Sequence, residues 1–176
     1  WSPLVVGTII LALLIRAFAF QSYEIPSGSM FPTLENGNRV VVNRLSYDLG
    51  DIERGQVIVF DRPAALEGEN DLINRIVGLG GETIRLIDGR VYVEGLRVVE
   101  PYLREPDSTR SSGPIPGCDA SIATPNQCVI PEGYVFVLGD NRTGSEDSRV
   151  FGPIGVDTIV GRAFWTVWPP TDLGHL

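Results

Sequence analysis

The chain contains no lysine, and all 14 of its basic Lys and Arg residues are arginine. It has 22 acidic residues, Asp and Glu together. It also has one histidine, one methionine and two cysteines. The net charge of -8 leaves no basic surface to neutralise phosphates, so we expect no nucleic-acid partner. One histidine and two cysteines do not make a closed set of four zinc ligands, and we predict no metal and no other cofactor.

Helical periodicity is missing after the first apolar run, whereas residues that break helices are abundant, with 20 Gly and 13 Pro. This composition argues against a helical bundle, and the hydrophobic content of 43% is too high for a disordered chain. A chain of 176 residues is long enough to bury one core. The sequence therefore predicts one loop-rich, mainly β domain.

The only long apolar run covers residues 1–20 and is interrupted chiefly by Arg16. About 20 apolar residues cross a bilayer as a helix, and an arginine near one end extends to the interface. A cleaved leader would end in small residues, but this run ends in bulky aromatic ones; a buried core helix is the other alternative. We therefore predict a transmembrane anchor over residues 1–22, with the lipid bilayer as a partner, followed by the β domain over residues 23–176.

After the anchor, apolar residues come in short runs that are typical of strands. Asp88 and Gly89 lie between two alternating runs from Ile84 to Gly95, which predicts a tight hairpin. We assign Trp165 and Trp168 to the core and the chain end. The other predicted strands are Arg39–Leu45, Gln56–Asp61, Ile73–Leu79, Tyr134–Leu138 and Ile159–Val167.

Residues 101–131 are rich in Pro, Gly, Ser and Asn, which predicts a long excursion from the sheet. This segment contains both cysteines, Cys118 and Cys128. Two cysteines this close in a loop suit a disulfide in an oxidising compartment, and two free surface thiols are the alternative. Because the anchor independently indicates a location outside the cytoplasm, we predict the disulfide.

Two polar segments carry residues from which a site can be built. Ile25–Leu34 reads IPSGSMFPTL, and its prolines and glycine restrict the backbone around Ser27 and Ser29. Gly139–Arg149 reads GDNRTGSEDSR and follows a predicted buried strand, where polar groups must satisfy one another. Taken alone, the first segment is more often a turn and the second is compatible with an ordinary solvated loop.

Together with NRIVGLGGE at residues 74–82, the two segments resemble the three ordered boxes of the bacterial type I signal peptidases, a family of membrane-anchored serine proteases. The order and the intervals match over nearly the whole chain. The resemblance implies a β-rich domain that removes N-terminal signal peptides from exported preproteins through serine acylation. It also implies a single-pass membrane protein with this domain on the exported side, whether periplasmic, extracellular or lumenal.

The resemblance assigns roles to individual residues. Ser29 corresponds to the nucleophile and Ser27 to a donor for the oxyanion, since acyl transfer needs donors aimed at the developing charge. Ser145 corresponds to the serine that orients the general base. The other matched positions are expected to support the site: the Asp147 and Arg149 ion pair, Met30 beside the nucleophile, and Arg75 and Asp140.

The match to the family fails at the general base, where the family has lysine and this chain has Asn74. An asparagine amide does not accept the serine proton at ordinary pH, and the neighbouring Arg75 stays protonated. Glu82 is not placed at the site by any sequence feature, and His175 lies close to the C-terminus. We therefore predict a signal peptidase that is impaired at its base. The alternatives are a functional peptidase whose base has been replaced deliberately, an active enzyme with another base, or a catalytically silent subunit that binds or assembles with other membrane proteins.

Overall fold

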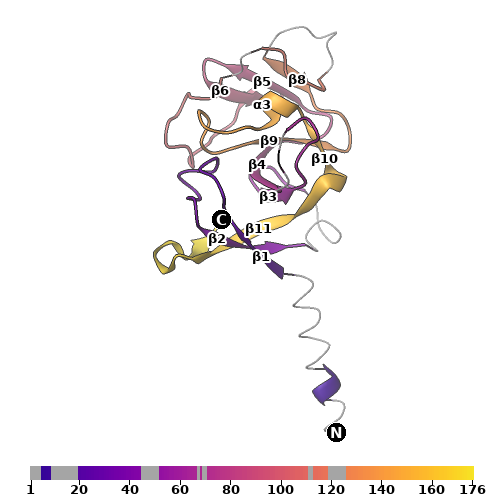
Figure 1. Ribbon diagram of the computed structural model, residues 1–176. Helices are drawn as coiled ribbons and strands as arrows, with labels where there is room; N and C mark the ends of the chain where they lie inside the picture. Colours follow the sequence, from indigo (N-terminus) through magenta and orange to yellow (C-terminus); the bar gives the residue numbers. More distant parts are fainter. Residues whose placement is uncertain are drawn as a thin grey trace.

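The structure is a computed structural model (Figure 1), and it describes residues 5–8, 20–44, 52–66, 68, 71–110, 113–118 and 126–176. Most of the predicted anchor lies outside these residues. Within the described ranges there is no helix of the length and apolar character that a membrane crossing needs. The first strand, β1 (Phe20–Glu24), begins inside the range predicted for the anchor. Residues 20–22 therefore belong to a sheet, which corrects the end of that prediction.

Among the described residues, the larger sheet has eight strands in the order β1-β2-β11-β3-β4-β9-β10, with β12 paired to β11. Its neighbouring strands are antiparallel, and Figure 1 shows β1, β2 and β11 side by side at the end of the domain near the N-terminus. This sheet confirms the mainly β prediction. Its strands after β1 are β2 (Arg39–Asn43), β3 (Val57–Phe60), β4 (Leu72–Gly78), β9 (Tyr134–Leu138), β10 (Ile154–Gly155), β11 (Ile159–Trp168) and β12 (Gly174–His175).

The smaller sheet, as far as the structure describes the chain, has four strands in the order β7-β6-β5-β8. Its centre is the predicted hairpin, in which Asp88 and Gly89 both have positive φ, 51° and 78°, as a two-residue hairpin turn requires. A Cβ at Gly89 would lie 1.8 Å from the carbonyl oxygen of Asp107, so no other residue fits this position. The strands are β5 (Thr83–Ile87), β6 (Arg90–Val93), β7 (Leu96–Arg97) and β8 (Gln127–Val129).

The breaker-rich segment 101–131 is not wholly an excursion. Its last part forms β8, which pairs with β5 and so completes the smaller sheet. Cys118 and Cys128 are joined by a disulfide, with their Cα atoms 5.0 Å apart. Because Cys128 belongs to β8, the bond ties the loop before it directly to the sheet.

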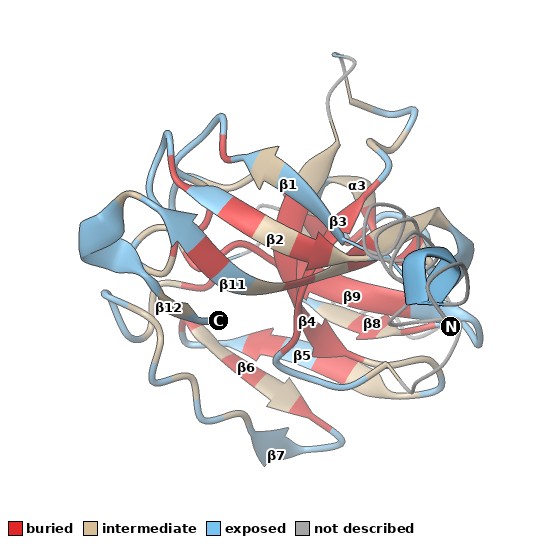
Figure 2. Cartoon of the chain, turned by 90° about the horizontal axis from the view of Figure 1, so that it is seen from below, coloured by how far each residue is buried: buried red, intermediate tan, exposed pale blue. Residues whose placement is uncertain are grey.

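Strand β4 lies in the interior of the molecule, and Figure 2 shows β4 and β9 largely buried. Every residue of β4 after Leu72 is buried, and so is every residue of β3. A strand that is covered on both faces has no solvent side for its polar residues. Asn74 and Arg75 are therefore interior polar residues, which must find partners within the protein or remain unsatisfied.

Trp165 and Trp168 are not in the core, contrary to the prediction from the sequence. Their exposed fractions are 41% and 54%. Both lie in the second half of β11, which extends past β3 and pairs with β2 and β12. Both rings lie at the surface, where Trp165 meets the ring of His175 edge-on with 6.3 Å between the ring centroids.

Candidate active site

Ser29 lies in the turn that joins β1 to β2, and the side chains on either side anchor this turn in the core. Met30 and Leu34 are fully buried and Ile25 is nearly so, whereas Ser29 is only partly buried. The hydroxyl of Ser27 lies 3.2 Å from the hydroxyl of Ser29, within hydrogen-bonding distance. The turn thus brings together the two hydroxyls to which the family resemblance assigns the roles of oxyanion donor and nucleophile.

The start of the second polar segment holds the Ser29 turn in place. The backbone N–H of Asn141 donates to the carbonyl oxygen of Ser29 at 2.9 Å, and its side-chain amide donates to the carbonyl oxygen of Gly28 at 3.0 Å. The hydroxyl of Thr33 donates to the Asp140 carboxylate in the same region. Sequence reasoning did not single out Asn141 or Thr33, although both lie inside the two segments.

Gly139 brings Ser145 close to the Ser29 turn. A Cβ at position 139 would lie 2.2 Å from the Oγ of Ser145 and 2.6 Å from the carbonyl oxygen of Ser29. Both groups therefore pack directly against the bare glycine backbone. The absence of a side chain at Gly139 is what lets the two segments approach each other this closely.

We expect Gly139→Ala to destabilise the protein by about 1–3 kcal/mol, because the added methyl group displaces either Ser145 or the Ser29 turn. Gly28→Ala is the matched control from the same site, since a Cβ at Gly28 meets no atom within 4 Å. Urea denaturation of the two variants beside the parent chain measures the difference. Equal stability of the two variants would show that the packing at Gly139 is looser than the structure indicates.

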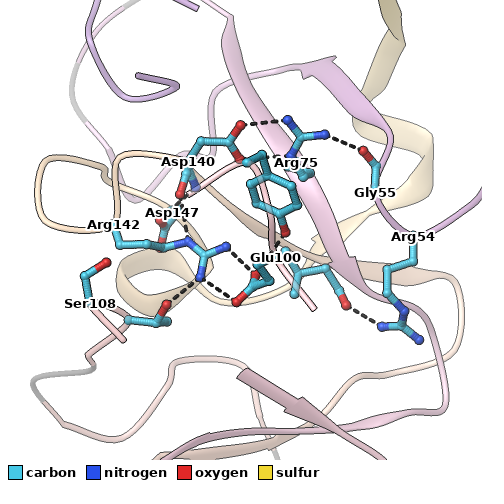
Figure 3. Close-up of polar contacts among 12 residues, drawn as sticks. Arg54, Gly55, Arg75, Glu100, Ser108, Asp140, Arg142 and Asp147 are labelled. Carbon is cyan, nitrogen blue, oxygen red and sulfur yellow. Dashed lines mark hydrogen bonds and ion pairs between the residues drawn. The ribbon is translucent and has the colours of Figure 1, made fainter. Parts of the chain in front are cut away.

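A buried ion pair connects β4 to this region (Figure 3). The guanidinium of Arg75 binds the Asp140 carboxylate through two hydrogen bonds, Nε to Oδ1 at 2.9 Å and Nη2 to Oδ2 at 2.7 Å. Its third nitrogen, Nη1, donates to the carbonyl oxygen of Gly55 at 2.7 Å. Two parallel bonds fix the orientation of both groups. The strand that carries Asn74 is thereby fixed relative to the segment that holds Ser29.

Asn74 is adjacent to Arg75 on β4, faces Ile58 of β3 across the ladder and is 2% exposed. Its amide nitrogen Nδ2 is buried and has no hydrogen-bond partner, and the same is true of the Ser145 hydroxyl. No other buried side-chain nitrogen or oxygen within the described ranges lacks a partner. Leaving such a group unsatisfied costs about 1–3 kcal/mol, so the two unsatisfied atoms are a notable exception in an otherwise paired interior.

The Asp147 and Arg149 pair forms as the resemblance implies. Arg149 binds the buried carboxylate through Nε to Oδ1 at 2.8 Å and Nη2 to Oδ2 at 2.7 Å. Asp147 also accepts from the backbone N–H of Gly139 at 3.0 Å and caps the short helix α3 (Ser148–Phe151). The pair therefore supports the backbone at Gly139 as well as the end of the segment.

A second buried network adjoins the site, and sequence reasoning missed most of it. Arg142 binds the Glu100 carboxylate and donates to the carbonyl oxygen of Gly139 at 3.0 Å, as Figure 3 shows in part. Tyr102 donates to Glu100 at 2.9 Å, and its ring lies 4.1 Å from the guanidinium of Arg75. Burial, followed by the charge of Glu100, raises the pKa of the Tyr102 hydroxyl. Burial disfavours the Arg142 cation, but Glu100 outweighs that effect and the pKa of Arg142 is raised.

The two residues considered as substitutes for the lysine make other contacts. Glu82 accepts from the backbone N–H of Leu79 at 2.7 Å and pairs with Arg54 at 2.7 Å. His175 lies in β12 against the Trp165 ring. Within the described ranges, no group of three or more His, Cys, Asp or Glu side chains is placed to hold a metal ion.

A family model described as "Signal peptidase, peptidase S26" matches residues 1–168. This chain belongs to that family. Signal peptidases of the S26 family are serine-type peptide hydrolases. This S26 chain is 39% identical to the signal peptidase I of Bacillus caldolyticus, over 95% of the chain and 89% of the relative. It is 37% identical to the probable signal peptidase I-2 of Synechocystis sp., over 97% of the chain and 73% of the relative. A solved signal peptidase I from Enterococcus faecalis V583 is 29% identical, covers 64% of this chain and 96% of its own, and has a TM-score of 0.48.

Proposed function

We propose that this protein binds the N-terminal signal peptides of exported preproteins at Ser29 and is impaired in cleaving them because Asn74 occupies the position of the general base. The observation that carries the proposal is the pair of buried, unpartnered atoms, Asn74 Nδ2 and Ser145 Oγ. A lysine at position 74 would supply an amine for the Ser145 hydroxyl to orient. With asparagine there, the orienting group has nothing to orient.

The chemistry explains why asparagine at position 74 would lower the rate of cleavage but not the binding of the peptide. Acylation requires the Ser29 Oγ to attack a peptide carbonyl carbon while its proton moves to a base. The Ser27 hydroxyl and the Ser29 backbone N–H would stabilise the oxyanion that forms, and neither depends on Asn74. Losing a positioned base costs about 100-fold to 10,000-fold in rate, whereas binding of the peptide backbone does not require it.

The contacts that hold the Ser29 turn are formed even with asparagine at position 74, and this favours retained binding of the signal peptide. Asn141 still holds the Ser29 turn, and the Arg75–Asp140 and Asp147–Arg149 pairs are both formed. The same observation favours a second candidate function, a catalytically silent subunit that holds an exported segment or assembles with another membrane protein. The two functions differ in whether any residual hydrolysis depends on Ser29.

For the location we propose a single transmembrane anchor with the β domain on the exported side of the membrane. The apolar run over residues 1–20 supports the anchor. The disulfide between Cys118 and Cys128 supports an oxidising compartment, since such bonds persist outside the reducing cytosol.

The test is to incubate the full chain in detergent with a labelled preprotein and to measure capture and cleavage separately. We expect capture with only slow cleavage, and a Ser29→Ala variant should lose that slow cleavage. Capture with no cleavage beyond that of Ser29→Ala would favour the silent subunit instead. Rapid cleavage by the parent chain would show that another residue serves as base. Absence of both capture and cleavage would refute the proposed site altogether.

A further inference from the structure

Two clefts lie on the side of the Ser29 turn where the Gly139–Arg149 segment runs. The smaller has a volume of about 200 Å³ and is lined by Phe31 of the Ser29 turn and by Asn141, among others. The larger has a volume of about 560 Å³ and is lined by Ser145. Arg142 and Thr143 line both clefts, so the two adjoin. The larger volume falls within the range of about 300–1,000 Å³ that is usual for ligand sites.

The charged side chains that line the larger cleft within the described residues are all arginines, although the chain as a whole is acidic. Three arginines, Arg110, Arg142 and Arg149, contribute to its lining, and no acidic residue of the described chain does. The whole sequence has 22 acidic residues and 14 basic ones, so the excess of basic residues in this lining is opposite in sign to the net charge of the chain. A concave surface lined by one sign of charge concentrates the opposite charge.

The three arginines are not equally available to a ligand. Arg142 is paired with Glu100 and Arg149 with Asp147. Arg110 is exposed, and its side chain forms no ion pair with any described residue. Its backbone carbonyl accepts from Arg149 Nη1 at 3.1 Å, which fixes the chain at this point. Arg110 is therefore the guanidinium that is free to bind a carboxylate.

The larger cleft approaches the proposed reaction site at Ser145, although Ser29 itself lines neither cleft. Ser145 lines the cleft and, through Gly139, packs next to the carbonyl oxygen of Ser29. Asn141 lines the adjoining smaller cleft and holds the Ser29 turn by two hydrogen bonds. A polypeptide that is bound across Ser29 would have one of its two flanks directed along this surface.

We propose that the cleft lined by Arg110, Arg142 and Arg149 binds an acidic stretch in one flank of the polypeptide that is held at Ser29. This inference rests on the proposed function, and it adds a charge specificity to it. Arg110 is the residue that determines the preference, since the other two guanidiniums are already neutralised. The attraction is electrostatic and should weaken as salt screens it.

The test uses the full chain in detergent and four synthetic peptides that share one Ala-x-Ala centre. Two peptides carry aspartates either before or after the centre, and the other two carry asparagines at the same positions. We expect one of the aspartate peptides to bind about 3-fold to 10-fold more tightly than its asparagine counterpart at low salt, with the difference lost at high salt. Fluorescence polarisation measures the affinities.

Arg110→Gln should abolish the preference, because it removes the guanidinium that is free to bind a carboxylate. The side chain is exposed, so its loss leaves the fold intact. Arg85→Gln is the matched control, since Arg85 is also exposed but lies in β5 of the smaller sheet, outside the cleft lining. Equal binding of all four peptides would overturn the inference and leave the proposed function standing. A preference that survives Arg110→Gln would also overturn it. No binding of any peptide would refute the proposed function itself.

Discussion

Asn74→Lys is expected to increase the rate of preprotein cleavage by about 100-fold to 10,000-fold over the parent chain. The position is buried in β4, and the Ser145 hydroxyl of the proposed site is buried without a partner, so we propose that this hydroxyl orients an amine at position 74. Burial lowers the pKa of a lysine, which makes its neutral, proton-accepting form available at ordinary pH. Gel analysis of a labelled preprotein in detergent measures the rate.

The pH profile and two controls identify the introduced amine as the base. Activity should rise with pH as the amine loses its proton and should level off above its pKa. The double change of Asn74→Lys with Ser29→Ala should be inactive. Asn74→Met introduces a side chain similar in length to lysine but without a base, so its cleavage rate should match that of the parent. An inactive but folded Asn74→Lys variant would contradict the assignment of position 74.

Asp140→Ala is expected to lower the free energy of unfolding by about 3–5 kcal/mol, because it leaves the Arg75 guanidinium buried without its counter-charge. The side chains of the pair are 8% and 0% exposed, and two hydrogen bonds join them. The substitution also removes the acceptor of the Thr33 hydroxyl and so loosens the Ser29 turn. Urea denaturation followed by circular dichroism measures the loss.

Glu24→Ala is the matched control, since it breaks an ion pair with Arg39 in which both side chains are exposed, 62% and 58%. Exposed pairs contribute about 0–1 kcal/mol, so this variant should stay close to the parent. If Asp140→Ala were as stable as Glu24→Ala, the Arg75–Asp140 pair would not be the connection between β4 and the Ser29 turn that we infer.

Local sequence patterns predicted the strands that alternate cleanly or are bounded by turn residues. The hairpin around Asp88 and Gly89 was readable because its two residues suit positive φ, which few other pairs adopt. Strands β3, β4, β9 and most of β11 were readable from runs of β-branched and aromatic residues. These signals are local, so they do not depend on which strands become neighbours.

The misassignments occurred where a local pattern had two physical solutions. Residues 20–22 adjoin the apolar run and are included in the predicted anchor, but β2 offers them a pairing partner. Trp165 and Trp168 are predicted to lie in the interior because large aromatic residues favour burial, yet both are exposed in the part of β11 that extends past β3. Strand β8 lies in a breaker-rich segment and is a strand because β5 is there to pair with it.

The sequence by itself determined the family, the two serines of the Ser29 turn and the asparagine at position 74, because these are matters of residue identity and order. Only the tertiary structure decided that Asn74 Nδ2 and Ser145 Oγ both lack partners, that Gly139 brings Ser145 against the Ser29 turn, and that Glu100 and Tyr102 support the site. Such contacts join residues far apart in the chain. They depend on how strands pair and on which polar groups lose water, and no local pattern records either.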